Sequence, residues 1–84
     1  MKEKEDKFQI WMLHFIARNH DISSINEEYL LECNLFEEGF IDSMGIMNMV
    51  MELEEEFDFS FTAEDFQDRR FSSILGLKEI ISEK

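Results

Sequence analysis

The fold of this chain is decided by residues 40–45, Phe40-Ile41-Asp42-Ser43-Met44-Gly45, which open a strongly periodic helical segment. A serine at a helix start is exposed and lies beside unpaired backbone N–H groups. A phosphate joined to it would lie in the positive end of the helix dipole. Ser and Asp are also the commonest N-cap residues, so the Asp42-Ser43 pair taken alone predicts an ordinary helix cap.

The segments on either side of this stretch show helical spacing of apolar residues. The pattern after the serine predicts a helix over residues 43–57, whose inward positions follow three- and four-residue steps: Ile46, Met49, Val50, Leu53 and Phe57. An earlier helix is predicted over residues 4–19, with one apolar stripe formed by Phe8, Trp11, Met12, Phe15 and Ile16. The long connection over residues 20–41, with a turn of helix at Glu27–Leu31, carries regular apolar residues that indicate packing against the core.

Two capping signals divide the remainder of the chain. Residues 62–65, Thr-Ala-Glu-Asp, predict a capping box for a short third helix, with Asp65 in place of the usual Glu or Gln. Ser72 or Ser73 is expected to cap a last helix, whose inward residues are Ile74, Leu77, Ile80 and Ile81. We therefore expect a single all-α domain over residues 1–84, a four-helix bundle of three main helices and one short one, with a long loop between the first two.

The composition is strongly acidic, with 20 Asp and Glu against 8 Lys and Arg and a net charge of −12. No Lys or Arg lies between Arg18 and Arg69. This balance excludes nucleic acid as a partner, disfavours an anionic membrane surface, and favours a partner with a basic patch. The single cysteine excludes an intramolecular disulfide and fits a cytoplasmic location. Because no apolar run approaches the ~18 residues of a membrane span, we expect no membrane insertion.

The order of these parts resembles the acyl carrier protein family and the related carrier domains of peptide and aminoacyl systems. The family motif is Asp-Ser-Leu or Asp-Ser-Met, and here it is matched by Asp42-Ser43-Met44. Residues 35–41 resemble the family's approach to the serine, and residues 50–58 resemble the end of its second helix. The resemblance covers roughly residues 25–82. It implies an acyl-carrier-like bundle in which 4′-phosphopantetheine is covalently attached to Ser43, while Asp42 helps to place the modifying transferase.

The residues themselves argue against an enzyme. No Gly-x-Ser-x-Gly elbow surrounds Ser43, and no paired His and acid is indicated. His14 and His20 share no Cys or His at ligand spacing, so no metal site is expected. The resemblance implies instead a carrier that holds an acyl or aminoacyl thioester and delivers it to enzymes of fatty-acid, polyketide, peptide or related biosynthesis. Its implied partners are a phosphopantetheinyl transferase, a loading ligase and acyl-processing enzymes with basic patches, and we expect the carrier to be a monomer.

The helix after the serine is expected to present a face to those partners. With the inward positions assigned, five residues are left facing outward or at the border: Met44, Met47, Met51, Glu54 and Glu55. Methionines at this spacing fit a core as well as an interface, and the acidic run fits a merely solvated face as well as a docking face. We predict that neutralising Glu54 and Glu55 weakens partner binding and leaves the fold intact.

Two departures from the fatty-acid carriers leave the cargo open. Gly45 stands where many of them have an acidic residue, and Asn48 stands where Glu is frequent. Gly45 and, weakly, residues 64–73 resemble the D-alanyl and other stand-alone aminoacyl carriers. A D-alanyl carrier for cell-envelope modification is therefore an alternative within the class. The alternative from another class is an unmodified acidic helical adaptor that binds a basic partner.

Overall fold

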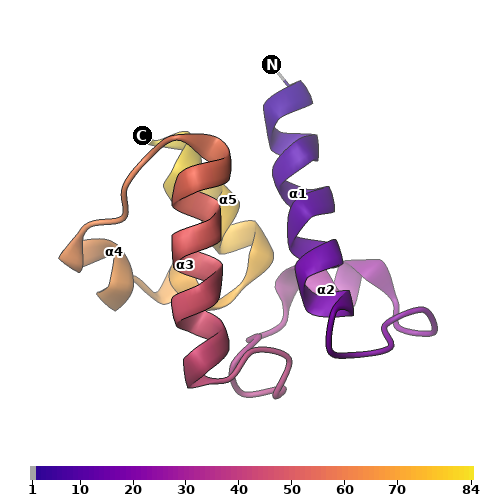
Figure 1. Ribbon diagram of the computed structural model, residues 1–84. Coiled ribbons are helices and arrows are strands. Elements are labelled where there is room, and N and C mark those ends of the chain that lie inside the picture. The colour runs from indigo at the N-terminus through magenta and orange to yellow at the C-terminus, as the bar shows by residue number, and fades with distance from the viewer. Residues whose placement is uncertain (1) are drawn as a thin grey trace.

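The computed structural model describes residues 2–84, with side chains from residue 7 onward, and all regular structure in this part of the chain is helical. The helices are α1 (Lys2–Ala17), α2 (Glu27–Glu32), α3 (Ser43–Phe57), α4 (Ala63–Gln67), the 3-10 helix η1 (Arg69–Ser72) and α5 (Ile74–Ser82). α1 and α3 stand side by side and run in opposite directions, α5 lies behind them, and α4 lies at one edge (Figure 1). The predicted all-α bundle with three main helices is confirmed.

α1 buries most of its predicted apolar stripe. The buried members are Phe8, Met12, Phe15 and Ile16. Trp11 is only half-buried, because it lies at the edge of the core with its ring stacked on that of Phe15, the centroids 5.2 Å apart. The Phe8 ring of α1 meets the Phe57 ring at the end of α3 edge-on at 5.9 Å. This aromatic contact joins the N-terminal half of α1 to the C-terminal end of α3.

The long connection before α3 is ordered against the core, as its apolar residues indicate. The predicted turn of helix is α2, whose N-cap Asn26 accepts a hydrogen bond from the Tyr29 backbone N–H at 3.1 Å. Leu35 is fully buried, and its N–H donates to the Ser72 carbonyl oxygen at 2.8 Å. The Leu35 carbonyl oxygen in turn accepts from the N–H of Ile41, at 3.2 Å. These bonds fix the approach to α3 to the C-terminal part of the molecule.

α3 packs through the face that the periodicity predicts. Met49 and Leu53 are fully buried, and Ile46, Val50 and Phe57 are half-buried and packed against the core. Burial of a side chain of this size contributes about 1.5–3 kcal/mol relative to leaving it in water. The helix ends at Asp58, which adopts the left-handed conformation with φ 57°. α3 is therefore held firmly on one side while its other side faces solvent.

The C-terminal corner closes the bundle through caps and a close backbone approach. The predicted capping box is present at α4, where Thr62 and Asp65 each accept from the other's backbone N–H. Ser73 rather than Ser72 caps α5, accepting from the Gly76 N–H at 3.0 Å. Gly76 lies so close to η1 that a Cβ there would stand 2.0 Å from the Arg70 carbonyl oxygen. α5 can therefore pack on η1 only because position 76 has no side chain.

Candidate functional site

Asp42 and Ser43 have separate roles at the start of α3. Asp42 is the N-cap, and its Oδ1 accepts a hydrogen bond from the Gly45 N–H at 2.7 Å. Ser43 is the first residue of the helix, its side chain is exposed, and its hydroxyl makes no hydrogen bond with the described residues. The capping function that Asp42-Ser43 predicts belongs to Asp42. The Ser43 hydroxyl is thus left accessible for a covalent attachment.

The electrostatics of this helix end suit an attached anion. α3 has 15 residues, so its dipole gives the first turn a partial positive charge. The first turn contains no acidic side chain, and Asp42 engages only one of its N–H groups. A phosphodiester on Ser43 would meet the remaining unpaired N–H groups of this turn. The residues present therefore fit a phosphate-linked group.

Gly45 allows the carboxylate of Asp42 to close over the helix end. A Cβ at position 45 would stand 3.1 Å from Ile41 Cγ2 and 3.2 Å from Asp42 Oδ1, both closer than ordinary van der Waals contact. Ile41 is buried, so it has little room to move away. The absence of a side chain at Gly45 therefore relieves crowding beside the cap, in addition to removing the negative charge found there in many fatty-acid carriers.

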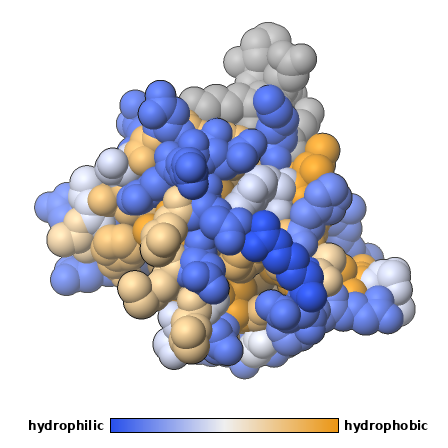
Figure 2. Space-filling view, viewed as in Figure 1, coloured by the Kyte–Doolittle hydropathy of each residue, from blue (hydrophilic) through white to orange (hydrophobic). Residues whose placement is uncertain are grey.

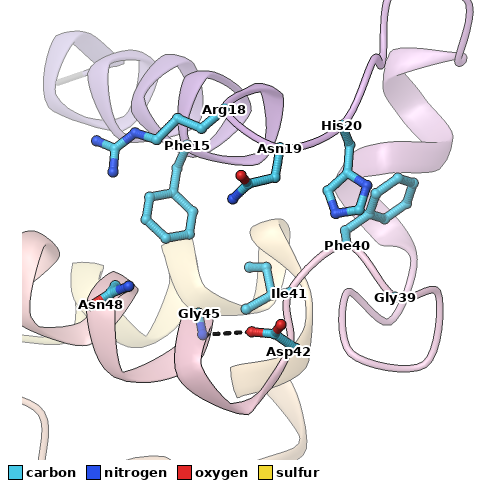
Figure 3. A pocket seen from close by; sticks show the side chains of 10 residues that line it. All are labelled: Phe15, Arg18, Asn19, His20, Gly39, Phe40, Ile41, Asp42, Gly45 and Asn48. Atoms are coloured by element: carbon cyan, nitrogen blue, oxygen red, sulfur yellow. Dashed lines mark hydrogen bonds between the residues drawn. The ribbon is translucent and has the colours of Figure 1, made fainter.

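An open groove lies beside this helix start, between the end of α1 and the loop that leads into α3 (Figure 3). Its volume is about 420 Å³. The lining residues come from three segments: Phe15, Arg18, Asn19 and His20, then Gly39, Phe40, Ile41 and Asp42, then Gly45 and Asn48. The His20 ring meets the Phe40 ring edge-on, with the centroids 5.5 Å apart. Sequence reasoning did not find this groove, because its residues lie far apart in the chain. Asp42, Gly45 and Asn48 each had a signal of their own, but nothing in the sequence joined them to the end of α1.

One ion pair fixes the groove wall that α1 provides. Both guanidinium nitrogens of Arg18 donate to the Glu52 carboxylate, at 2.9 and 2.8 Å, and the Arg18 guanidinium also lies over the Phe15 ring at 4.9 Å. The hydrogen bonds from Arg18 lower the pKa of Glu52. Because both side chains are substantially exposed, the pair orients the end of α1 against α3 more than it stabilises the fold.

The three methionines of the predicted partner face of α3 are exposed to solvent. Met44, Met47 and Met51 have 76%, 65% and 63% of their surface exposed. In Figure 2 apolar side chains gather over α3 and α4 among hydrophilic ones. The structure thus places these three methionines outside the core. Their spacing alone had allowed either position.

The two predicted acidic partner residues differ from each other. Glu55 is exposed, whereas Glu54 is half-buried, and its Oε2 accepts a hydrogen bond from the Phe61 backbone N–H at 2.8 Å. Glu54 therefore holds the loop after α3, so a substitution that neutralises it has to keep the acceptor oxygen if this hydrogen bond is to remain. The bond forms because the turn at Asp58 brings the chain back along α3 and places the Phe61 N–H beside Glu54.

Comparison with protein families decides the function that this geometry serves. Residues 22–81 match the family described as a phosphopantetheine attachment site. The chain belongs to this family. It is therefore a non-catalytic carrier that holds acyl groups on a covalent 4′-phosphopantetheine arm and delivers them in biosynthesis. Such carriers are modified by phosphopantetheinyl transferases and interact with acyl-processing enzymes.

No curated protein and no solved structure matched the carrier. Among residues 2–84, none of the helices combines the length and apolar character needed to cross a membrane. Among residues 7–84, whose side chains the structure describes, no group of three or more His, Cys, Asp and Glu residues is arranged to hold a metal ion.

Proposed function

We propose that Ser43 is the residue that bears the arm and that the Asp42 carboxylate helps the transferase to recognise it. The observation that carries this proposal is the exposed Ser43 hydroxyl, unpartnered among the described residues, at the start of a 15-residue helix already capped by Asp42. The family match supports a phosphopantetheine on this chain, and Asp42-Ser43-Met44 is the motif that fits it.

The chain's own thiol does not suit the role of the arm. Cys33 is buried, and its Sγ lies 3.6 Å from the Leu30 carbonyl oxygen. Burial raises the pKa of the Cys33 thiol, which reduces the fraction present as the reactive thiolate. A thiol at the end of a long arm, in contrast, can reach the active sites of separate enzymes and raise the effective concentration of the cargo there.

The test is the mass of the protein after co-expression with a phosphopantetheinyl transferase. The protein should gain the mass of one phosphopantetheinyl group, and Ser43→Ala should abolish this gain. Ser60→Ala is the matched control, because Ser60 is also exposed and its side chain makes no hydrogen bond with the described residues. No gain with several transferases would favour the unmodified acidic adaptor. A gain that persists in Ser43→Ala would place the attachment elsewhere.

We further propose an aminoacyl cargo, as in the D-alanyl branch, in preference to a fatty-acyl one. Two features support it: Gly45 stands without a side chain at the position that is acidic in many fatty-acid carriers, and the groove beside it is open and largely polar. A polar groove offers little apolar surface to a hydrocarbon chain. Loading assays with the modified carrier, using amino-acid and fatty-acid ligases in parallel, test this choice. Efficient loading by fatty-acid ligases alone would overturn it.

The proposed partner face is a row of exposed methionines on α3, with Glu55 at its C-terminal end; the methionine row consists of Met44, Met47 and Met51. Glu54 adds negative charge from a half-buried position. Flexible methionine side chains adapt to several partners, which suits a carrier that meets a transferase, a ligase and downstream enzymes. The net charge of −12 favours enzymes with basic patches at the docking site. A monomeric, cytoplasmic carrier fits these features, and the location and oligomeric state remain predictions.

A further inference from the structure

The sulfur atoms of the described chain fall into two groups that differ in exposure. Met12 and Met49 are fully buried, and Cys33 is buried as well. The methionine row is open to solvent, with 63% to 76% of the surface of each of its residues exposed. Among residues 7–84 every methionine belongs to one of these two groups. An oxidant in solution therefore reaches the row and is kept from the other three sulfurs.

The exposed sulfurs lie on the side of α3 that carries Ser43. Residues three and four positions apart are neighbours on a helix surface, so Met47 lies one turn from both Ser43 and Met44. Met51 lies one turn further along the same side, whereas Met49 points the other way and is buried. In Figure 2 apolar side chains gather over α3 at the molecular surface. An enzyme that acts on the Ser43 hydroxyl must therefore approach over the methionine row.

The thioether of methionine reacts with peroxides. A sulfur lone pair takes one oxygen atom from hydrogen peroxide, the O–O bond breaks, and the remainder of the peroxide leaves as water. The sulfur is oxidised by two electrons to a sulfoxide, and the peroxide is reduced by the same two. Methionine sulfoxide reductases reverse the step: two thiols supply two electrons and become a disulfide, while the oxygen leaves as water. The row can therefore change between an apolar and a polar form.

We propose that the methionine row is a reversible oxidation site through which peroxides weaken the docking of enzymes that act on Ser43. The inference rests on the proposed attachment at Ser43 and on the proposed partner face. A docked enzyme covers the row and removes water from it. A thioether loses little when it is covered, whereas a sulfoxide oxygen loses its hydrogen bonds to water. Oxidation therefore lowers the affinity of the partner face and leaves the Ser43 hydroxyl chemically unchanged.

The fold does not depend on the atoms that are oxidised. The side chains of the methionine row stay in solvent in the free carrier, so their sulfoxide oxygens remain hydrated there. Oxidation of Met12 or Met49 would put a polar oxygen into the core, but both side chains are fully buried. The sorting of the sulfurs thus directs oxidation to binding and away from stability.

The test measures how fast a phosphopantetheinyl transferase modifies the apo carrier before and after treatment with hydrogen peroxide. The apo form is used because the thiol of an attached arm would itself consume peroxide, and catalase removes the peroxide before the transferase is added. Peptide mass mapping should find one added oxygen on each methionine of the row and none on Met12 or Met49. Met1 lies outside the described residues and is counted separately.

The value of kcat/KM for the transferase should fall about fivefold, through KM, which corresponds to the loss of one favourable docking contact. Reduction by methionine sulfoxide reductases with a dithiol should restore it. An unchanged kcat/KM for a carrier with an oxidised row overturns the inference and leaves the attachment at Ser43 standing. If the untreated carrier gains no arm, the attachment and the inference are both wrong.

A matched variant separates the row from the rest of the chain. Met44→Leu/Met47→Leu/Met51→Leu keeps apolar side chains of similar volume and removes the oxidisable sulfurs. Peroxide should leave its kcat/KM unchanged, and an equal fall in this variant overturns the role of the row. Urea denaturation should give the same midpoint for the wild-type carrier before and after oxidation. A lowered midpoint, or added oxygen on Met12 or Met49, would attribute the slower modification to a damaged core and overturn the inference.

Discussion

At the start of α3 the polar groups are open to a ligand, whereas at the corner formed by η1 and α5 they are bonded to one another. The Ser43 hydroxyl and the Asn48 amide have no hydrogen-bond partner among the described residues. At the corner, the Arg70 guanidinium donates to Asp68 at 2.9 Å and to Glu83 at 2.8 Å. Groups that satisfy each other hold the backbone in place, and groups without partners are available for binding. The carrier thus separates two regions: the corner formed by η1 and α5, which holds the fold in place, and the start of α3, whose polar groups are available for binding.

The largest expected loss of stability is at the corner formed by η1 and α5. Gly76→Ala would place a Cβ 2.0 Å from the Arg70 carbonyl oxygen and 2.6 Å from the Arg70 Cα, so α5 and η1 would have to move apart. Overpacking against a backbone that cannot yield costs about 3 kcal/mol or more. We expect a loss of this size in the free energy of unfolding, measured by urea denaturation.

Gly39→Ala, in the loop that leads into α3, is the control. Gly39 has φ 82° but no atom within 4 Å of a Cβ placed there, so the cost is conformational alone. We expect about 1 kcal/mol. If both variants lost the same stability, the close approach of α5 to η1 would not be the reason for the glycine at position 76.

Glu54 and Glu55 test, within α3 alone, whether a hydrogen-bonded side chain stabilises the fold more than an exposed one. Glu54→Ala leaves the Phe61 N–H without its acceptor, which should cost about 1–2 kcal/mol of unfolding free energy. Glu55→Ala changes an exposed side chain and should stay within about 0.5 kcal/mol. Glu54→Gln keeps an acceptor oxygen and should recover much of the loss. Equal effects of the two alanine substitutions in denaturation would contradict the internal role of Glu54.

Glu54 and Glu55 also show which features of the fold can be predicted from the periodicity of the sequence. Spacing identified the helices, the buried face of α3 and the capping box, because each depends on residues a few positions apart. The hydrogen bond from Phe61 to Glu54 depends on the chain turning back at Asp58, and the groove depends on α1 meeting the loop at Phe40. Such contacts between distant segments leave no periodic signal. The site was therefore predictable at Ser43 and not at Asn19.

The methionine row should affect binding far more than stability. Met47 and Met51 are exposed, so alanine at both positions should change the free energy of unfolding by less than about 0.5 kcal/mol. If partners dock on this row, the same change should weaken binding to a loading ligase by about 1 kcal/mol. Calorimetric titration of the ligase gives the affinity. A matched change of Phe66, exposed on α4, shows whether the effect belongs to α3. Unchanged affinity in the methionine variant would move the docking face elsewhere.

The smallest expected effect is the pH dependence of the stability that the ion pairs at the η1–α5 corner contribute. Hydrogen bonds from Arg70 lower the pKa values of Asp68 and Glu83. Carboxylates with a lowered folded-state pKa add stability above their ordinary pKa of about 4 and lose it as the pH falls through the lowered value. Arg70→Gln removes this contribution. The stability difference between wild type and Arg70→Gln should therefore be largest near neutral pH and shrink in acid.

Comparing two proteins in this way cancels the relief of acidic repulsion, which the net charge of −12 makes large in both. Urea denaturation near neutral pH and well below pH ~4 gives the two differences. Lys7→Gln is the control, because Lys7 is exposed and makes no ion pair with the described residues, whereas the charge of Arg69 also lowers the pKa of Asp68. A difference for Arg70→Gln that stays constant or grows in acid would mean that the corner is held by packing at Gly76 and Phe71. The ion network would then be a consequence of that packing.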